Sequence, residues 1–204
     1  MDPRELSELV SKLIRERNFR RAEELLLGAR TAAAAEGDAQ TTQLVLSELV
    51  ELYCISEPRR LAEAEVLSGE RERLTASAYS KLQTAMILHH GARDYARAVP
   101  KLEEAIARGK AEHDDGTIYT SLSLLGQACL ELGHTEKALA VLAEFEKMVA
   151  SKKSFVVGDE TCFLEALRAR RLESERVTRL ASTLAPVCRD SAFKERLKAL
   201  TVHK

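Results

Sequence analysis

Apolar residues recur along most of the chain with the spacing of α-helices. The clearest stretch lies between residues 118 and 132, where five apolar residues follow one another at steps of four or three and so share one helical face. These residues are Ile118, Leu122, Leu125, Cys129 and Leu132. A second stripe covers residues 138–149, and Gly133 between the stripes can adopt the left-handed conformation that ends a helix. The pattern predicts an antiparallel hairpin in which each helix buries its stripe on the other.

The same pattern continues along the chain and predicts an all-α fold. We expect helical hairpins at about residues 4–36, 41–73, 76–113, 117–150 and 159–189, followed by a C-terminal capping segment at 190–204. The first helix has a clear start, because Asp2 can cap it, Pro3 suits its first turn and Glu5 stands three residues after the cap. The length of 204 residues suits one domain, so 1–204 is expected to be a single helical-repeat domain.

Small residues recur near the start of the second helix in four of these hairpins. They are Ala22, Ala62, Ala98 and Ala138, at separations of 40, 36 and 40 residues. An apolar residue follows each alanine four positions later, at Leu26, Val66, Leu102 and Leu142. A close crossing of two helices needs a small side chain at its nearest approach. The recurrence therefore predicts a hairpin template that the chain repeats.

These residues carry a resemblance to the tetratricopeptide-repeat family. The match is closest between Tyr119 and Ala150 and extends to the stretch that begins at Asp94. The matching residues are Asp94, Tyr95, Ala98, Leu102, Ala105, Leu125, Gly126, Leu132, Gly133 and Ala138. The resemblance covers about residues 4–150, with repeats of 36–40 residues where the family has a strict 34.

The resemblance implies a right-handed solenoid of about four antiparallel hairpins plus a degenerate C-terminal hairpin, whose first helices line a concave groove for an extended or helical peptide. The candidate groove residues are Ser47, Glu51, Gln83, Ile87, His90, Ser123, Gln127 and Glu131. The family's clamp for a peptide carboxylate needs a lysine followed four residues later by an asparagine. The matching pairs here are Ser7 and Ser11, Ser47 and Glu51, Gln83 and Ile87, and Ser123 and Gln127. Binding of an acidic C-terminal tail is therefore disfavoured, and a groove of mixed polar and apolar character is expected.

Pro100 does not fit a regular sixth helix. It falls six residues after Asp94, the expected cap, where its missing N–H would break a helical hydrogen bond. Two alternatives follow: the helix bends at Pro100, or its regular part begins later than Asp94.

Composition and charge narrow the class of protein. Hydrophobic residues make up 45% of the chain, aromatic residues only 4%, and tryptophan is absent, which favours closely packed helices. A net charge of −1 gives no global attraction to nucleic acid or to an anionic membrane. No signal peptide and no apolar run of about 20 residues is visible, so we expect a soluble, cytoplasmic protein. The four cysteines, Cys54, Cys129, Cys162 and Cys188, form no C-x-x-C pair and are expected to be small buried apolar residues.

Few residues suggest chemistry. Side chains of the adjacent His89 and His90 would point about 100° apart on a helix and could not hold one metal together. His113, Asp114 and Asp115 resemble a helix end followed by a cap. The acidic pairs Glu23-Glu24, Glu103-Glu104 and Asp159-Glu160 fall on expected solvent faces or helix starts. Because no nucleotide, hydrolase or metal motif is present, we expect no enzymatic activity, no metal and no cofactor.

Basic residues gather near the C-terminus, from Arg168 to Lys198, but glutamates interrupt them and aromatic residues are nearly absent. A charged capping helix is therefore favoured over a nucleic-acid surface. The sequence favours a protein-interaction module that binds a peptide or helix of another protein. We expect no membrane segment in this chain. The alternatives are a self-associating structural protein and, with less support, an all-α enzyme or a nucleic-acid-binding regulator.

Overall fold

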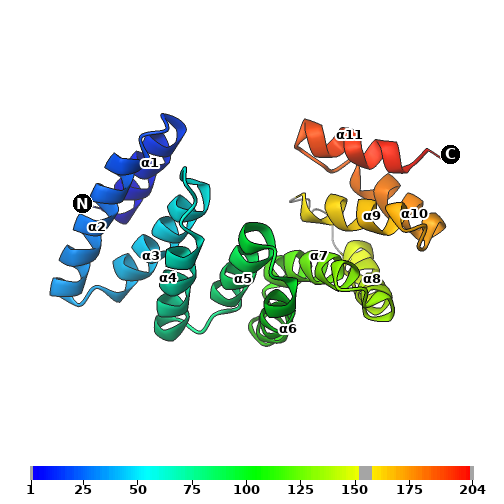
Figure 1. Cartoon of the computed structure of the whole chain (residues 1–204), viewed down its shortest axis with the longest axis horizontal. Helices are drawn as coiled ribbons and strands as arrows, with labels where there is room; N and C mark the ends of the chain where they lie inside the picture. The colour runs from blue at the N-terminus through cyan, green and yellow to red at the C-terminus, as the bar shows by residue number, and fades with distance from the viewer. Residues whose placement is uncertain (1, 152–157, 203–204) are drawn as a thin grey trace. The chain divides into compact units, whose positions relative to one another are not determined.

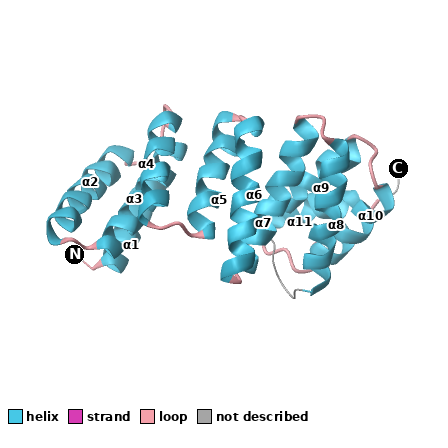
Figure 2. Ribbon diagram, turned by 90° about the horizontal axis from the view of Figure 1, so that it is seen from below, coloured by secondary structure: helices cyan, strands magenta, loops and turns pink. Residues whose placement is uncertain are grey.

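The computed structural model describes residues 2–151 and 158–202 and shows that the protein is all-helical. These residues form eleven α-helices and one π-helical turn, with no strand among them. The first unit of the chain contains α1 (Pro3–Arg15), α2 (Phe19–Glu36), α3 (Ala39–Ile55), α4 (Leu61–Leu74), α5 (Ala78–Met86) and the π-helical turn η1 (Ile87–Ala92). The second contains α6 (Tyr95–Glu112), α7 (Asp115–Glu131), α8 (Thr135–Ser151), α9 (Asp159–Ala169), α10 (Ser174–Leu184) and α11 (Ser191–Leu200). The all-α prediction is confirmed (Figures 1 and 2).

Contacts within the chain group the helices into two compact units. Unit 1 comprises Met1–Arg93 and unit 2 comprises Asp94–Lys204. In unit 1, α3 packs against both α2 and α4, and α5 packs against α4. In unit 2, α7 packs against α6, α8 and α9, which makes it the most enclosed helix of that unit. No helix in the described part of the chain has the length and apolar character needed to cross a bilayer.

The helix ends follow from local chemistry that the sequence displays. Asp2 caps α1 by accepting a hydrogen bond from the Arg4 N–H, with Pro3 in the first turn, as predicted. Gly133 has a φ of +76° between α7 and α8. Asp114 caps α7 by accepting hydrogen bonds from the backbone N–H and the hydroxyl of Thr117, at 3.0 and 2.6 Å. Carboxylates at helix N-termini satisfy backbone donors that the helix leaves unpaired.

Pro100 lies inside α6, which already begins at Tyr95 and is capped by Asp94. The alternative that the regular helix starts later is therefore wrong. Pro100 is exposed, so its ring lies on the solvent side of the helix.

The predicted recurrence of a small residue near the start of every second helix is found at Ala22, Ala98 and Ala138, but the predicted position in the second hairpin is wrong. Ala62 is exposed, and the side chain of Val66 is 68% exposed. Ala64 is buried in their place, because α4 starts only at Leu61. With this correction α2, α4, α6 and α8 each bury an alanine as their fourth residue, at Ala22, Ala64, Ala98 and Ala138. The residue four positions later is also fully buried, at Leu26, Ser68, Leu102 and Leu142.

In α10 the order of the small and the larger buried residue is reversed. Val177 is the fourth residue of α10 and Ala181 follows four positions later, and both are fully buried. The polar member of the series, Ser68, is matched by a hydroxyl on the neighbouring helix, since its Oγ lies 2.7 Å from Oγ1 of Thr84. A hydrogen bond of this kind is what allows a buried hydroxyl to replace an apolar side chain.

An aromatic cluster fills the centre of unit 2. The ring centroids of Tyr119 and Phe145 lie 5.0 Å apart, and those of Phe145 and Phe163 lie 6.2 Å apart at nearly a right angle. Gly126 on α7 faces Phe163 so closely that a methyl group at this position would overlap the ring. The absence of a side chain at Gly126 therefore permits α9 to pack against α7.

Candidate functional site

The strongest candidate for a binding site is an apolar groove of about 510 Å³ in unit 1. It lies between α3 on one side and α5 with η1 on the other. We call it the α3–α5 groove and define it by its lining residues, which are Val50, Glu51, Cys54, Ile55, Arg59, Tyr79, Gln83, Met86, Ile87, His90 and Gly91. Its volume falls within the range of sites that bind small ligands or the side chains of a peptide.

Helical spacing places the lining residues of each helix on the face that borders the groove. On α3, Val50, Glu51 and Cys54 stand at steps that place them on a common face. On the opposite wall, Tyr79, Gln83 and Met86 do the same. Ile55 and Tyr79 leave 40% and 49% of their surfaces exposed, so the groove presents large apolar groups to solvent. Such exposure is common at surfaces that meet a partner.

The groove contains four of the eight predicted binding residues. Glu51, Gln83, Ile87 and His90 line it, and Ser47 lies beside it through a hydrogen bond with Gln83. The other seven lining residues were not predicted. The exposed apolar residues Ile55 and Tyr79 could have been found from their helical spacing, since Ile55 follows Ser47 by eight residues and Tyr79 precedes Gln83 by four.

Gln83 is held by partners on two other helices. Its side-chain oxygen accepts a hydrogen bond of 2.7 Å from Nη1 of Arg71 on α4. Its amide nitrogen lies 3.2 Å from Oγ of Ser47 on α3, to which it donates. Both polar ends of Gln83 therefore have partners within the fold, so it links the two walls of the groove instead of offering free hydrogen bonds to a ligand.

Glu51 differs from Gln83 in having no partner. Among the described residues, no hydrogen bond or ion pair reaches its carboxylate. Although part of the side chain is exposed, apolar surroundings desolvate the carboxylate and raise its pKa, and the negative charge of Glu48 raises it further. The neighbouring Glu48 accepts a hydrogen bond from the Ser7 hydroxyl at 2.7 Å.

Cys54 is not suited to act as a nucleophile. Burial raises the pKa of its thiol, and although Arg59 favours the thiolate, this opposing effect is smaller. A thiol reacts as the thiolate, so a raised pKa makes it less reactive. We conclude that Cys54 contributes apolar surface to the groove.

The π-helical turn η1 carries His90 and Gly91 on the groove side. His89 is buried and His90 is exposed, yet their rings meet edge to face with centroids 4.7 Å apart. The Nδ1 atoms lie 3.4 Å apart. The two histidine rings are in contact, although side chains that point about 100° apart on a helix were expected to be separated. No group of three or more metal-binding side chains occurs in the part of the chain that the structure describes.

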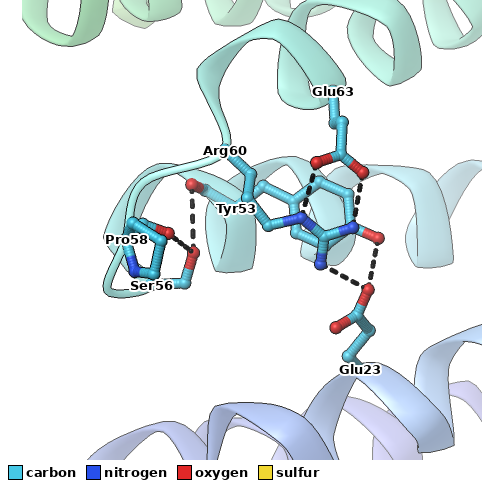
Figure 3. A network of polar contacts seen from close by, with 6 residues as sticks. All are labelled: Glu23, Tyr53, Ser56, Pro58, Arg60 and Glu63. Carbon is cyan, nitrogen blue, oxygen red and sulfur yellow. Dashed lines mark hydrogen bonds and ion pairs between the residues drawn. The ribbon is translucent and has the colours of Figure 1, made fainter.

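A polar network fixes the connection between α3 and α4 (Figure 3). The groove residues Ile55 and Arg59 belong to the same stretch of sequence. Arg60 donates to Glu23 on α2 at 2.6 Å and to both oxygens of Glu63 on α4, at 2.6 and 2.5 Å. Its guanidinium carbon lies 3.9 Å from the ring centroid of Tyr53. These contacts join three helices through one side chain.

Tyr53 completes this network. Its hydroxyl donates to the same oxygen of Glu23 at 2.7 Å. Burial and this hydrogen bond to a carboxylate raise the pKa of Tyr53 to about 12. The hydrogen bonds that Arg60 donates to Glu63 and Glu23 likewise raise the pKa of Arg60. Ser56 donates to the carbonyl oxygens of Tyr53 and Pro58, and the peptide bond before Pro58 is cis.

The three predicted binding residues on α7 are engaged within unit 2. Ser123 is buried and donates to the carbonyl of Tyr119. Gln127 donates to the carbonyl of Asp159 at 2.8 Å, at the start of α9. Glu131 forms an ion pair of 2.9 Å with Arg170. Residues at the two ends of α9 therefore engage Gln127 and Glu131, and α7 itself engages Ser123.

Glu160 corrects a further expectation. The pair Asp159-Glu160 was predicted to lie on solvent at a helix start, and it does begin α9, but Glu160 is fully buried. Both of its carboxylate oxygens accept from the N–H of Gly158.

Basic residues near the C-terminus are largely paired within unit 2. Arg176 and Arg179 bind Glu146, Arg196 binds Glu165, Arg170 binds Glu131, and Lys198 binds Glu195. Arg168 donates to the hydroxyl of Thr178 and to the carbonyl of Leu200. These pairs reduce the positive charge that the region could offer to phosphates.

Comparison with known protein families finds none that matches this chain, and comparison with curated proteins finds no match either.

Proposed function

We propose that this chain is a non-enzymatic protein-interaction module, similar to tetratricopeptide-repeat proteins, that binds an apolar peptide or helix of a partner in the α3–α5 groove. The observation that carries the proposal is the groove itself. It is apolar, about 510 Å³ in volume, and bordered by the exposed side chains of Ile55 and Tyr79. Burial of exposed apolar surface is the main source of affinity when a helix binds in a groove.

The repeated packing template supports a stack of hairpins. The fourth residue of α2, α4, α6 and α8 is a fully buried alanine. The α3–α5 groove lies between α3 and α5, the first helices of the second and third predicted hairpins. In repeat proteins built this way, the surface formed by corresponding helices is the usual binding surface.

A reducing compartment such as the cytoplasm suits the four cysteines. Cys54, Cys129, Cys162 and Cys188 are all free thiols in this structure. Secreted proteins of modest size generally use their cysteines in disulfides. The cytoplasm is therefore the compartment that we propose.

A selection experiment tests the binding function. A library of short random peptides displayed on phage is selected against the whole chain, and the enriched peptides are synthesised for fluorescence anisotropy. The double variant Ile55→Ser with Tyr79→Ser removes apolar surface from both edges of the groove without adding charge. We expect it to weaken binding at least tenfold, since loss of apolar contact area in a small interface costs more than 1 kcal/mol.

The matched control is Val66→Ser on α4. Val66 is also an exposed apolar residue of unit 1, but it does not line the groove. We expect it to leave peptide binding unchanged, with circular dichroism confirming that both variants fold. Failure to enrich any peptide, or equal binding by the double variant and the wild type, would contradict the proposed groove.

Self-association is the second candidate function, and one observation favours it. Exposed Leu27 and Val66 border another apolar depression in unit 1, of about 370 Å³, between α2 and α4. Light scattering over a range of concentrations tests this function directly. An increase in mass with concentration that Val66→Glu abolishes would support it, and a constant monomer mass would exclude it.

A further inference from the structure

We propose that the α3–α5 groove selects partner segments that carry a lysine or arginine among apolar residues, with the cation pairing with Glu51. This inference rests on the proposed function and adds the chemistry of the partner. Glu51 is the only acidic side chain that lines the groove.

Glu51 differs from the polar groups near it, because those groups have hydrogen-bond partners within the fold. The other carboxylates close to α3 have partners within the fold: Glu48 accepts from Ser7, and Glu23 accepts from Tyr53 and Arg60. The polar ends of Gln83 are also engaged. Only Glu51 combines an apolar setting with a carboxylate that no described residue contacts through a hydrogen bond or ion pair.

The electrostatic setting of Glu51 favours a cation from outside the fold. Apolar surroundings desolvate the carboxylate, and the like charge of Glu48 repels it, so both effects raise its pKa. A cation beside Glu51 would offset the desolvation and the repulsion together. Arg59 lines the same groove but forms no ion pair with Glu51, and it is exposed to solvent.

The shape of the groove favours lysine or arginine in a protein segment over a small cation. Both side chains have a long aliphatic stem below the charged head. The stem can lie along the half-buried Cys54 and Met86 while the head reaches Glu51, and neighbouring apolar residues of the same segment can contact Ile55 and Tyr79. A helix with an apolar stripe and one cation beside it satisfies all of these contacts.

The test uses charge reversal in the peptide selection. The random library is selected in parallel on the wild-type chain, on Glu51→Lys and on the control Glu8→Lys, which reverses an exposed charge on α1 outside the groove. We expect the wild type and Glu8→Lys to enrich lysine or arginine flanked by apolar residues, and Glu51→Lys to enrich aspartate or glutamate at that position. For a selected peptide, we expect Glu51→Gln to weaken binding about tenfold. Replacing the peptide's cation with methionine should weaken binding by a similar factor.

The outcomes separate this inference from the proposed function. If peptides bind and the variant Ile55→Ser with Tyr79→Ser weakens them, but Glu51→Lys selects the same sequences as the wild type, the inference is overturned and the binding function stands. If no enriched peptide depends on Ile55 and Tyr79, both are overturned. A double-mutant cycle between Glu51→Gln and the peptide's cation gives the decisive number, because an additive result excludes a direct pair.

Discussion

The setting of Glu51 in the α3–α5 groove disfavours the charged form of its carboxyl group. A carboxylate in apolar surroundings loses hydration, and Glu48 on the same helix adds like-charge repulsion. No described residue compensates either effect through a hydrogen bond or ion pair with Glu51. Residues that lower stability without a compensating contact often serve a binding site, which is the role proposed for Glu51.

The raised pKa of Glu51 predicts how stability depends on pH. The folded protein binds the proton of Glu51 more tightly than the unfolded chain, so its carboxyl favours the folded state at low pH, and this contribution is lost as the pH rises through the raised pKa. At neutral pH the charged form is destabilising. Glu51→Gln should therefore raise the free energy of unfolding by about 0.5 kcal/mol at neutral pH, a small value because the side chain is partly exposed to water.

Thermal unfolding followed by circular dichroism at several pH values measures this effect. The gain from Glu51→Gln should shrink as the pH falls through the raised pKa of Glu51, because the wild-type carboxyl then becomes neutral as well. Glu8→Gln, on the exposed surface of α1, is the matched control and should show no comparable gain. A less stable Glu51→Gln protein at neutral pH would contradict the prediction.

Individual groove residues show what the sequence could and could not predict. Both Glu51 and Gln83 were predicted to face the groove, because helical spacing and the repeat resemblance place them on first helices. Their different roles depend on residues far away in the chain: Arg71 and Ser47 engage Gln83, while no such partner reaches Glu51. Periodicity within one helix carries no information on which side chains of other helices come within hydrogen-bonding distance.

The connection between α3 and α4 shows the same limit at the level of elements. A helical hairpin over residues 41–73 was predicted, but the start of its second helix, α4, at Leu61 was not. Most helices here begin at a serine, aspartate or asparagine that caps them, whereas α4 follows Arg60 and has no side-chain cap. Arg60 instead fixes this helix start through Glu23 and Glu63. Without a local cap signal, the register of the second hairpin was predicted two residues too early.

Arg60 should therefore be a structural residue of unit 1. Arg60→Ala removes hydrogen bonds to two carboxylates and the contact with the ring of Tyr53, and it leaves Glu23 without its cation. We expect the free energy of unfolding to fall by about 2 kcal/mol. Arg60→Lys should restore only part of this loss, since an ammonium group cannot contact both oxygens of Glu63 and one of Glu23 in the planar geometry of guanidinium.

The adjacent arginine supplies the control. Arg59→Ala changes the same residue type in the same connection, but Arg59 is exposed and forms no ion pair or hydrogen bond with a described residue. Urea denaturation of the three variants compares them, and Arg59→Ala should stay within about 0.5 kcal/mol of the wild type. Equal losses for Arg59→Ala and Arg60→Ala would show that the network in Figure 3 does not determine stability.

At the scale of the whole molecule, the two units have different kinds of core. Unit 1 is built mainly on aliphatic residues, with Tyr53 at its border, and its groove remains open to solvent. Unit 2 encloses α7 among three helices around an aromatic cluster, and residues at the two ends of α9 engage Gln127 and Glu131 of α7. The sequence pattern predicted the same groove surface on the first helix of every hairpin. It carries no information on the packing of α9 against α7, and so it could not exclude α7 from the predicted groove.

Two glycines in helix interiors allow the units to be perturbed separately. At Gly126 in unit 2 an added methyl group would overlap the ring of Phe163, so Gly126→Ala should destabilise that unit by about 1–3 kcal/mol. At Gly28 on α2 nothing lies within 4 Å of the added methyl group. Gly28→Ala should therefore stabilise unit 1 by up to about 1 kcal/mol, because alanine favours the helix and no contact opposes it.

Hydrogen exchange measured by mass spectrometry shows where each substitution acts. Because contacts group within Met1–Arg93 and within Asp94–Lys204, Gly126→Ala should speed exchange of amides in α7 and α9 and leave α2 to α4 unchanged. Gly28→Ala should slow exchange in α2 and leave α7 unchanged. Faster exchange in both units after Gly126→Ala would mean that they unfold as one cooperative structure. With independent units, the groove residues of α3 keep their geometry when unit 2 is weakened, so the Gly126→Ala protein should bind the selected peptides with wild-type affinity.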